Sequence, residues 1–118
     1  MSQSFQVVDL FAGPGGLAEG FSAFTDQAGN RPFNVTLSVE KERAAHKTLQ
    51  LRAFLRQFDE FPEEYYDALN GKKPLPNWAE TQSGEWETAE EEALRLTLGE
   101  ESAAATIDAR INAIMRLN

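Results

Sequence analysis

The chain has 118 residues, an apolar content of 42% and a formal net charge of −8. This length corresponds to one ordinary domain or a part of one, and the apolar content argues against a wholly disordered chain. No apolar run reaches the roughly 20 residues that span a bilayer, no secretory leader pattern is present, and there is no cysteine for a disulfide or a thiolate metal site. These features predict a soluble, cytoplasmic protein that does not contact a membrane.

The charges are unevenly distributed along the chain. Residues 1–58 carry five acidic and six basic side chains, whereas residues 59–101 carry thirteen acidic side chains against three basic ones. Nucleic-acid binding depends largely on cationic contacts with phosphates, so the acidic section is a poor surface for DNA. We interpret it as a solvated helical face, and we do not expect this chain to bind DNA tightly by itself.

The first half of the chain alternates between strand patterns and helix patterns. Residues 5–10 and 33–39 are short segments rich in β-branched and aromatic residues, and we expect both to be strands. Residues 17–24 and 42–58 have apolar side chains at helical spacing. A strand, helix, strand, helix order predicts parallel pairing with right-handed crossovers, which is the start of a doubly wound α/β sheet.

Two expectations concern side chains on these helices. Leu17, Phe21 and Phe24 stand at helical spacing, so we expect this face to lie on the sheet. His46 is the only histidine and has no neighbouring ligand at metal-binding spacing. It is therefore predicted to be an exposed helical residue.

The second half of the chain has mostly helical patterns. Residues 62–69 predict a short helix, and residues 102–117 predict a longer one with an apolar stripe. Residues 88–91 have the spacing of a capping box ahead of four apolar positions, which predicts a helix as far as Gly99. In total the sequence predicts two strands, or three at most.

We therefore divide the chain into a β-α-β-α segment, 1–58, and an acidic, mostly helical segment, 59–118. Two or three parallel strands do not make a closed sheet, so the chain has the character of the first third of a larger α/β domain. An incomplete sheet leaves an exposed edge that can pair with another copy, and a homodimer through this edge is expected.

Closely spaced glycines separate the first strand from the first helix and indicate a ligand site. Glycine allows a sharp turn and a close backbone approach, while the helix start supplies N–H donors and a partial positive charge. Glu40 directly follows the second strand, where a carboxylate can accept hydrogen bonds from ribose hydroxyls. The stretch from Gly13 to Ala18 also satisfies the dinucleotide fingerprint in its alanine-ended form.

Two ligand classes share this geometry. Asp9 precedes the glycines, and an anionic wall favours the sulfonium and ammonium groups of S-adenosylmethionine (SAM) while it repels a pyrophosphate. Pro14 removes one N–H from a loop that a phosphate would need as a donor. We therefore favour SAM over a dinucleotide such as NAD. A tight turn without any ligand is the third interpretation.

Two stretches within the first 50 residues resemble the DNA cytosine-5 methyltransferases. Asp9-Leu10-Phe11-Ala12-Gly13-Pro14-Gly15-Gly16-Leu17 resembles the first motif of that family, and Ser38-Val39-Glu40-Lys41-Glu42 resembles the second. The resemblance implies the N-terminal SAM-binding portion of such an enzyme, with a partial Rossmann-like parallel sheet followed by a mostly helical segment. It also implies SAM as the cofactor without any metal, DNA as the partner of the full-length enzyme, and methyl transfer to C5 of cytosine.

The resemblance further implies which residues contact SAM. Phe11 would pack on the adenosine portion, Glu40 would hold the ribose hydroxyls, and Lys41 would cover the adenine with its aliphatic stem. The methionine end would be lined by the loop backbone of Ala12, Gly13, Gly15, Gly16 and Leu17.

The family's catalytic groups have no counterpart in this sequence. The family's nucleophile is a cysteine that attacks a base flipped out of the duplex, and this sequence has no cysteine. No acidic residue beyond position 58 stands in a pattern that matches the family's catalytic glutamate. We assign no catalytic residue and expect the chain to be inactive alone. It is then a fragment of a methyltransferase, one half of a split enzyme, or a degenerate copy that binds SAM or a partner without catalysis.

Overall fold

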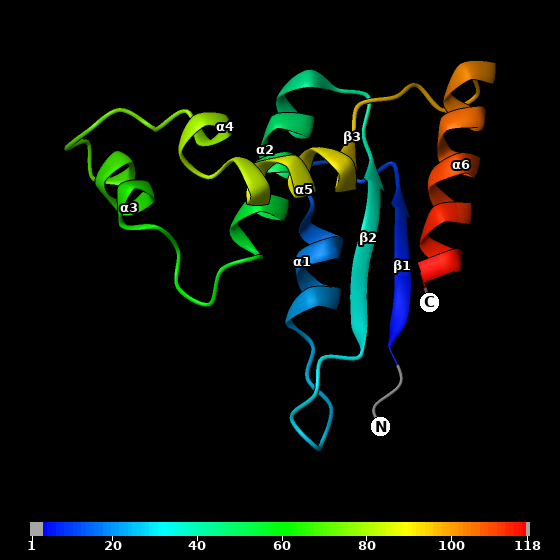
Figure 1. The fold of residues 1–118 in the computed structure, drawn as a ribbon, viewed down its shortest axis with the longest axis horizontal. Helices are drawn as coiled ribbons and strands as arrows, with labels where there is room; N and C mark the ends of the chain where they lie inside the picture. Colours follow the sequence, from blue (N-terminus) through cyan, green and yellow to red (C-terminus); the bar gives the residue numbers. More distant parts are fainter. Residues whose placement is uncertain (1–3, 118) are drawn as a thin grey trace.

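The centre of the molecule is a three-stranded parallel sheet in the order β1-β2-β3 (Figure 1). The computed structural model describes residues 4–117. Strand β1 spans Phe5–Leu10, β2 spans Phe33–Val39, and β3 is the two-residue strand Ala93–Leu94. Because β2 lies in the middle, β1 and β3 form the two edges. The predicted α/β class with a parallel sheet is confirmed.

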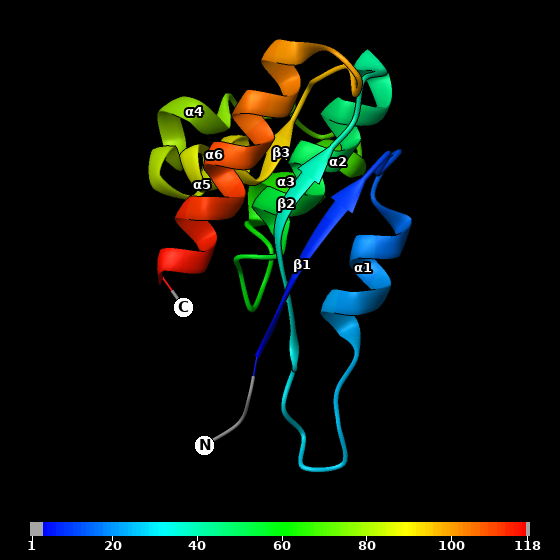
Figure 2. The ribbon, with the colours of Figure 1, turned by 90° about the vertical axis from the view of Figure 1, so that its right-hand side faces the viewer.

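Six helices surround this sheet on both faces. They are α1 (Gly16–Ala23), α2 (Arg43–Leu55), α3 (Glu63–Leu69), α4 (Trp78–Thr81), α5 (Ser83–Glu92) and α6 (Glu101–Leu117). Helices α1, α2 and α5 lie on one face, α6 lies on the other, and α3 stands away from the sheet (Figures 1 and 2). The predicted helices over 17–24, 42–58, 62–69 and 102–117 are confirmed to within a few residues.

The core on the face covered by α6 is formed by alternate apolar side chains of β2 and by the apolar side chains along one face of α6. Leu37 and Val39 are almost completely buried and contact Ile107. Partly buried side chains pack around this cluster, namely Val8, Leu94, Leu96, Leu98, Ile111 and Ile114. The α6 stripe thus covers β2 and the chain around β3, since side chains three and four apart share one face of a helix.

A second core cluster, formed by side chains of α2, α4 and α5, is aromatic. Phe54 is fully buried, and its ring centroid lies 5.1 Å from Phe58, 4.9 Å from Trp78 and 5.5 Å from Trp86. Tilted and edge-to-face ring pairs at these separations are the arrangements that aromatic side chains prefer. This cluster therefore fastens α4 and α5 to α2.

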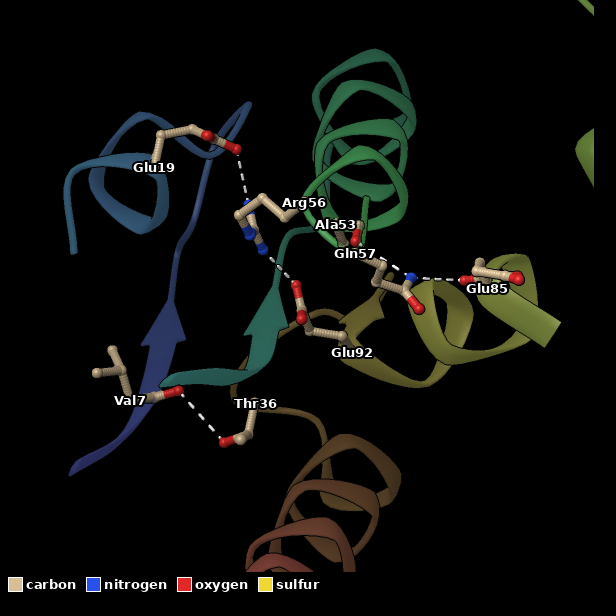
Figure 3. A network of polar contacts seen from close by, with 8 residues as sticks. All are labelled: Val7, Glu19, Thr36, Ala53, Arg56, Gln57, Glu85 and Glu92. Carbon is tan, nitrogen blue, oxygen red and sulfur yellow. Dashed lines mark hydrogen bonds and ion pairs between the residues drawn. The ribbon is translucent and has the colours of Figure 1, made fainter. Parts of the chain in front are cut away.

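An ion bridge ties three helices together on the same face (Figure 3). The guanidinium of Arg56, just after α2, donates to Glu19 of α1 at 2.7 Å and to Glu92 of α5 at 2.5 Å. Burial raises the pKa of the Glu92 carboxyl, although the nearby guanidinium opposes this shift. Gln57 adds a link from its amide to the Glu85 carbonyl oxygen at 2.7 Å.

The predicted helix from residue 88 to Gly99 is confirmed only as far as Glu92, and its continuation to Gly99 is wrong. Helix α5 ends at Glu92, because the backbone of Ala93 is extended and pairs with Ser38 of β2. Thr88 is not a cap: its hydroxyl donates to the Gly84 carbonyl inside α5. The apolar residues that followed the capping-box pattern instead form β3 and the chain after it.

Two side-chain predictions also need correction. Leu17 is 64% exposed, and in α1 it is Ala18 that is buried. His46 is half-buried rather than exposed, with its Nε2 2.9 Å from the Ala93 carbonyl oxygen. The burial of His46 thus involves a neighbour that is distant in sequence. Among residues 4–117, no helix is long and apolar enough to cross a membrane.

Candidate functional site

The glycine loop turns sharply from β1 into α1 and packs on α2. Three of its residues have positive φ angles: Phe11 at 58°, Gly13 at 59° and Gly15 at 97°. A Cβ on Gly15 would lie 3.0 Å from Leu49 Cδ1, so this glycine is required both for its backbone angle and for the close contact. Phe11 adopts this conformation without being glycine, and backbone strain of this kind concentrates at functional sites.

The Glu40 side chain ties the glycine loop to the end of β2. Its Oε1 accepts the Gly13 N–H at 3.0 Å, and its Oε2 accepts the Glu42 N–H at 2.7 Å. The Ala12 N–H adds a backbone link to the Val39 carbonyl oxygen at 2.9 Å. The carboxylate therefore lies beside the loop, as the sequence predicted for an acid at this position.

The loop from Ala12 to Gly15 offers no free N–H group. The N–H groups of Ala12 and Gly13 are used by β2 and Glu40, and Pro14 has none. The Gly15 N–H donates to the Ala12 carbonyl oxygen at 3.2 Å. A phosphate cradle needs several backbone N–H groups directed at the anion, and these four residues do not provide them.

A hollow of about 310 Å³ lies next to the loop, at the carboxyl ends of β2 and β3. Seven residues line it: Phe11, Val39, Glu40, Lys41, Leu96, Thr97 and Leu98. The Phe11 side chain is 80% exposed. A second hollow of about 860 Å³ shares Glu40, Lys41, Leu96 and Thr97 and extends towards the start of α6. The two hollows therefore adjoin, and the smaller one has an aromatic ring and a carboxylate in its lining.

The structure separates the eight predicted site residues into two groups. Phe11, Glu40 and Lys41 line the hollow together. The other five, Ala12, Gly13, Gly15, Gly16 and Leu17, form the loop and the start of α1 and are not among its lining residues. Gly13 is joined to the hollow through its hydrogen bond to Glu40.

Sequence reasoning missed the wall formed by Leu96, Thr97 and Leu98. A signal for it was present: the leucines at 94, 96 and 98 alternate with polar residues, as in a strand. Ligands of open α/β sheets bind outside the carboxyl ends of the strands. Recognition of a third strand would therefore have placed these residues at the site.

Asp9 does not line the hollow, although it precedes the glycines. The residue is only 8% exposed, and its Oδ2 has no hydrogen-bond partner among the described residues. Burial raises the pKa of the Asp9 carboxyl. Ser38, its register partner on β2, is also fully buried, with an unpartnered hydroxyl in the described part of the chain. Glu40 rather than Asp9 thus presents the negative charge to the hollow.

No protein family model, no curated protein and no solved structure matches this chain. Within residues 4–117 there is also no group of three or more metal-ligating side chains placed to hold an ion.

Proposed function

We propose that the hollow binds S-adenosylmethionine and that the chain is the SAM-binding portion of a DNA cytosine-5 methyltransferase with a Rossmann-like fold. The observation that carries the proposal is the use of the loop N–H groups. A glycine loop in which the N–H groups of Ala12, Gly13 and Gly15 are already occupied, with a carboxylate beside it, suits a cationic nucleoside better than a pyrophosphate.

The lining of the hollow supports the same ligand class. Phe11 offers an exposed ring, and Leu96 and Leu98 offer apolar surface, which together suit a flat heterocycle such as adenine. The Glu40 carboxylate retains lone pairs that can accept hydrogen bonds from ribose hydroxyls. The volume of the hollow, about 310 Å³, falls at the lower end of the roughly 300–1,000 Å³ range of ligand sites.

The chain's own part in a methyl transfer is to bind and orient the methyl donor. SAM supplies an electrophilic methyl group when it is bound. Attack on cytosine in this family needs a thiolate, and the sequence contains no cysteine. Methylation therefore requires a nucleophile from another polypeptide segment. The absence of cysteine is also compatible with a second candidate function, a module that binds SAM without catalysis.

Calorimetric titration with SAM and, separately, with NAD⁺ tests the ligand class. We expect SAM to bind and NAD⁺ to give no saturable heat, because the loop from Ala12 to Gly15 has no free N–H donor for the pyrophosphate. NAD⁺ binding more tightly than SAM would overturn the proposal, and so would a lack of saturable binding for both ligands.

Replacing Glu40 by glutamine tests the role of its carboxylate. We expect Glu40→Gln to weaken SAM binding by about tenfold or more, because charge-assisted hydrogen bonds are lost and the loop loses one acceptor. Glu100→Gln is the matched control, since Glu100 is exposed and lines only the neighbouring hollow. Equal affinities for the two variants, measured on samples with unchanged circular dichroism, would remove Glu40 from the site.

A further inference from the structure

One wall of the hollow depends on a strand that is too short to hold its own conformation. Strand β3 consists of Ala93 and Leu94, and the wall at residues 96–98 begins two positions after it. A pair of residues does not maintain an extended conformation without partners. The groups that hold β3 therefore set the position of the wall.

The backbone of β3 makes contacts on two sides. On the β2 side, the Leu94 carbonyl oxygen accepts the Glu40 N–H at 3.0 Å. Successive carbonyl groups of a strand point to opposite sides, so the Ala93 carbonyl group is directed away from β2. The Ala93 N–H donates to the Ala89 carbonyl oxygen and closes helix α5. The Ala93 carbonyl group thus needs a donor from outside the sheet.

The His46 ring of α2 supplies this donor. Its Nε2 lies 2.9 Å from the Ala93 carbonyl oxygen, and Ala93 is only 2% exposed. A carbonyl oxygen can only accept, so the contact is a hydrogen bond when the ring carries a hydrogen on Nε2. Water cannot readily reach a carbonyl group at this depth, and a buried acceptor that loses its donor is destabilising. His46 therefore holds the start of β3.

The start of α2 connects the same ring to the ligand side of the hollow. The Glu42 N–H donates to Glu40 Oε2 at 2.7 Å, and the Glu42 side chain accepts the N–H groups of Ala44 and Ala45. The His46 N–H donates to the Glu42 carbonyl oxygen at 2.9 Å. A short series of hydrogen bonds thus runs from the Glu40 carboxylate through the first turn of α2 to β3.

Other contacts limit how far the wall depends on His46. The Arg95 Nε donates to the Lys41 carbonyl oxygen at 3.0 Å, but Arg95 is exposed, so water competes for this bond. The leucines of residues 94–98 also pack on the core covered by α6. Loss of the His46 hydrogen bond should therefore loosen the wall locally and leave the rest of the fold in place.

We propose that His46 is a positioning residue for the hollow: by holding the Ala93 carbonyl group, its ring fixes the wall at residues 96–98 against which the ligand lies. His46 lines neither hollow, so it acts through β3 and not by contact with the ligand. The part of the proposal that concerns a ligand rests on the proposed SAM site. The part that concerns the wall does not, and it is measured without ligand.

Amide exchange of the ligand-free full chain tests the hold on β3. His46→Leu fills the space without a donor, whereas His46→Gln keeps a side-chain N–H that can reach Ala93. The Glu40 N–H reports on the pairing of β2 with β3, and the Ala12 N–H, which donates to the Val39 carbonyl oxygen, reports on the glycine loop. We expect His46→Leu to speed exchange at Glu40 by about tenfold and to leave Ala12 within about twofold. His46→Gln should resemble the natural chain at both amides.

Three outcomes of the exchange experiment would overturn the proposal. Equal acceleration at Glu40 and Ala12 would mean a general loss of stability, not a local one. An unchanged rate at Glu40 in His46→Leu would mean that the ring does not hold β3. Equal rates in the leucine and glutamine variants would mean that the donor is irrelevant.

Nitrogen-15 NMR of the natural chain gives a measurement that needs no substitution. His46 is the only histidine in the sequence, so its ring signals require no assignment. We expect the neutral ring to carry its hydrogen on Nε2, because the Ala93 carbonyl oxygen needs a donor there. A neutral ring with its hydrogen on Nδ1 would overturn the proposal.

Titration with SAM tests whether the wall matters to the ligand. We expect His46→Leu to weaken SAM binding by about tenfold, because only molecules with the wall in place are competent to bind, and His46→Gln to stay within about twofold of the natural chain. Gln57→Leu is the matched control. It removes a side-chain hydrogen bond to the Glu85 carbonyl oxygen, 2.7 Å long, at the other end of α2 and outside both hollows, and it should leave the affinity unchanged.

The two experiments separate this proposal from the proposed function. Faster exchange at Glu40 together with an unchanged SAM affinity in His46→Leu would overturn the link between the wall and the ligand. A natural chain that does not bind SAM would overturn the proposed function and the ligand part of this proposal, while the exchange rates would still decide whether His46 holds the wall.

Discussion

The loop between β1 and α1 is held mainly by backbone hydrogen bonds, whereas the segment from α4 to α5 is held by aromatic side chains. In the loop, the Gly13 N–H donates to the Glu40 carboxylate at 3.0 Å, and the Ala12 N–H donates to the Val39 carbonyl oxygen at 2.9 Å. In the α4–α5 segment, the rings of Trp78 and Trp86 surround Phe54. The first region depends on backbone conformation, and the second depends on the volume and shape of side chains.

This difference teaches where each region is sensitive to substitution. The loop should respond to changes at glycine and at Glu40, because these residues set its backbone path. The aromatic region should respond to loss of ring volume, because interiors are packed without spare space. Two pairs of substitutions separate the two kinds of dependence, and a third change, in β1, is expected to have a smaller effect on stability.

Phe54→Ala should have the largest effect. It removes the ring at the centre of the aromatic core and leaves a cavity, so we expect a loss of about 3–5 kcal/mol in the free energy of unfolding. Denaturant titration followed by tryptophan fluorescence measures this, since Trp78 and Trp86 report on the same cluster. Leu69→Ala, at a residue that is 65% exposed, should change stability by less than about 0.5 kcal/mol. Similar losses in both variants would show that the aromatic core does not fasten the segment.

A pair of glycine substitutions tests the dependence of the loop on its backbone. Gly15→Ala should destabilise the fold by about 1–2 kcal/mol or more, because its φ is +97° and the new Cβ would contact Leu49. Gly84→Ala, within α5 and with open space around it, should stabilise by about 0.5–1 kcal/mol. Thermal unfolding of both variants measures the difference. Stabilisation by Gly15→Ala would contradict the loop geometry.

Asp9→Asn should have the smallest effect, and one that depends on pH. Burial raises the pKa of the Asp9 carboxyl in the folded chain above its ordinary value of 3.8, so ionisation of Asp9 weakens folding as the pH rises above that value. Asparagine avoids this penalty, and we expect it to stabilise the fold at pH 7 relative to the unchanged chain. The gain should disappear below pH 3.8, where the carboxyl is protonated in both states. Urea titrations across this pH range measure the difference in the free energy of unfolding between the variant and the unchanged chain. A difference that grows as the pH falls would contradict the expectation.

Much of the fold could be predicted because its signals are local. The strands β1 and β2, the helix α2 and the helix α6 follow from hydrophobic periodicity, and the turn before α1 follows from its glycines. Glu40 could be placed beside the loop for the same reason, since the carboxyl ends of neighbouring parallel strands lie at one edge of a sheet.

The errors lie where long-range contacts decide the structure. Residues 93–94 follow a capping-box pattern that predicted a helix, while the leucines at 94, 96 and 98 alternate as in a strand; the pairing with β2 decides between the two patterns and forms β3. His46 is half-buried because the fold brings its ring to residue 93, where its Nε2 lies 2.9 Å from the Ala93 carbonyl oxygen. Arg56, one of several basic residues in its helix, finds two carboxylates that only the packing of α1 and α5 brings within reach.

The sequence by itself determined the glycine turn, the two main strands and the acid that follows the second strand, because each is specified by residues within a few positions of one another. Only the tertiary structure decided that a third strand forms and that residues 96–98 complete the hollow. The physical reason is that a two-residue strand has no stability of its own. Its conformation, and the wall that follows it, exist only through hydrogen bonds and apolar contacts with partners far away in the sequence.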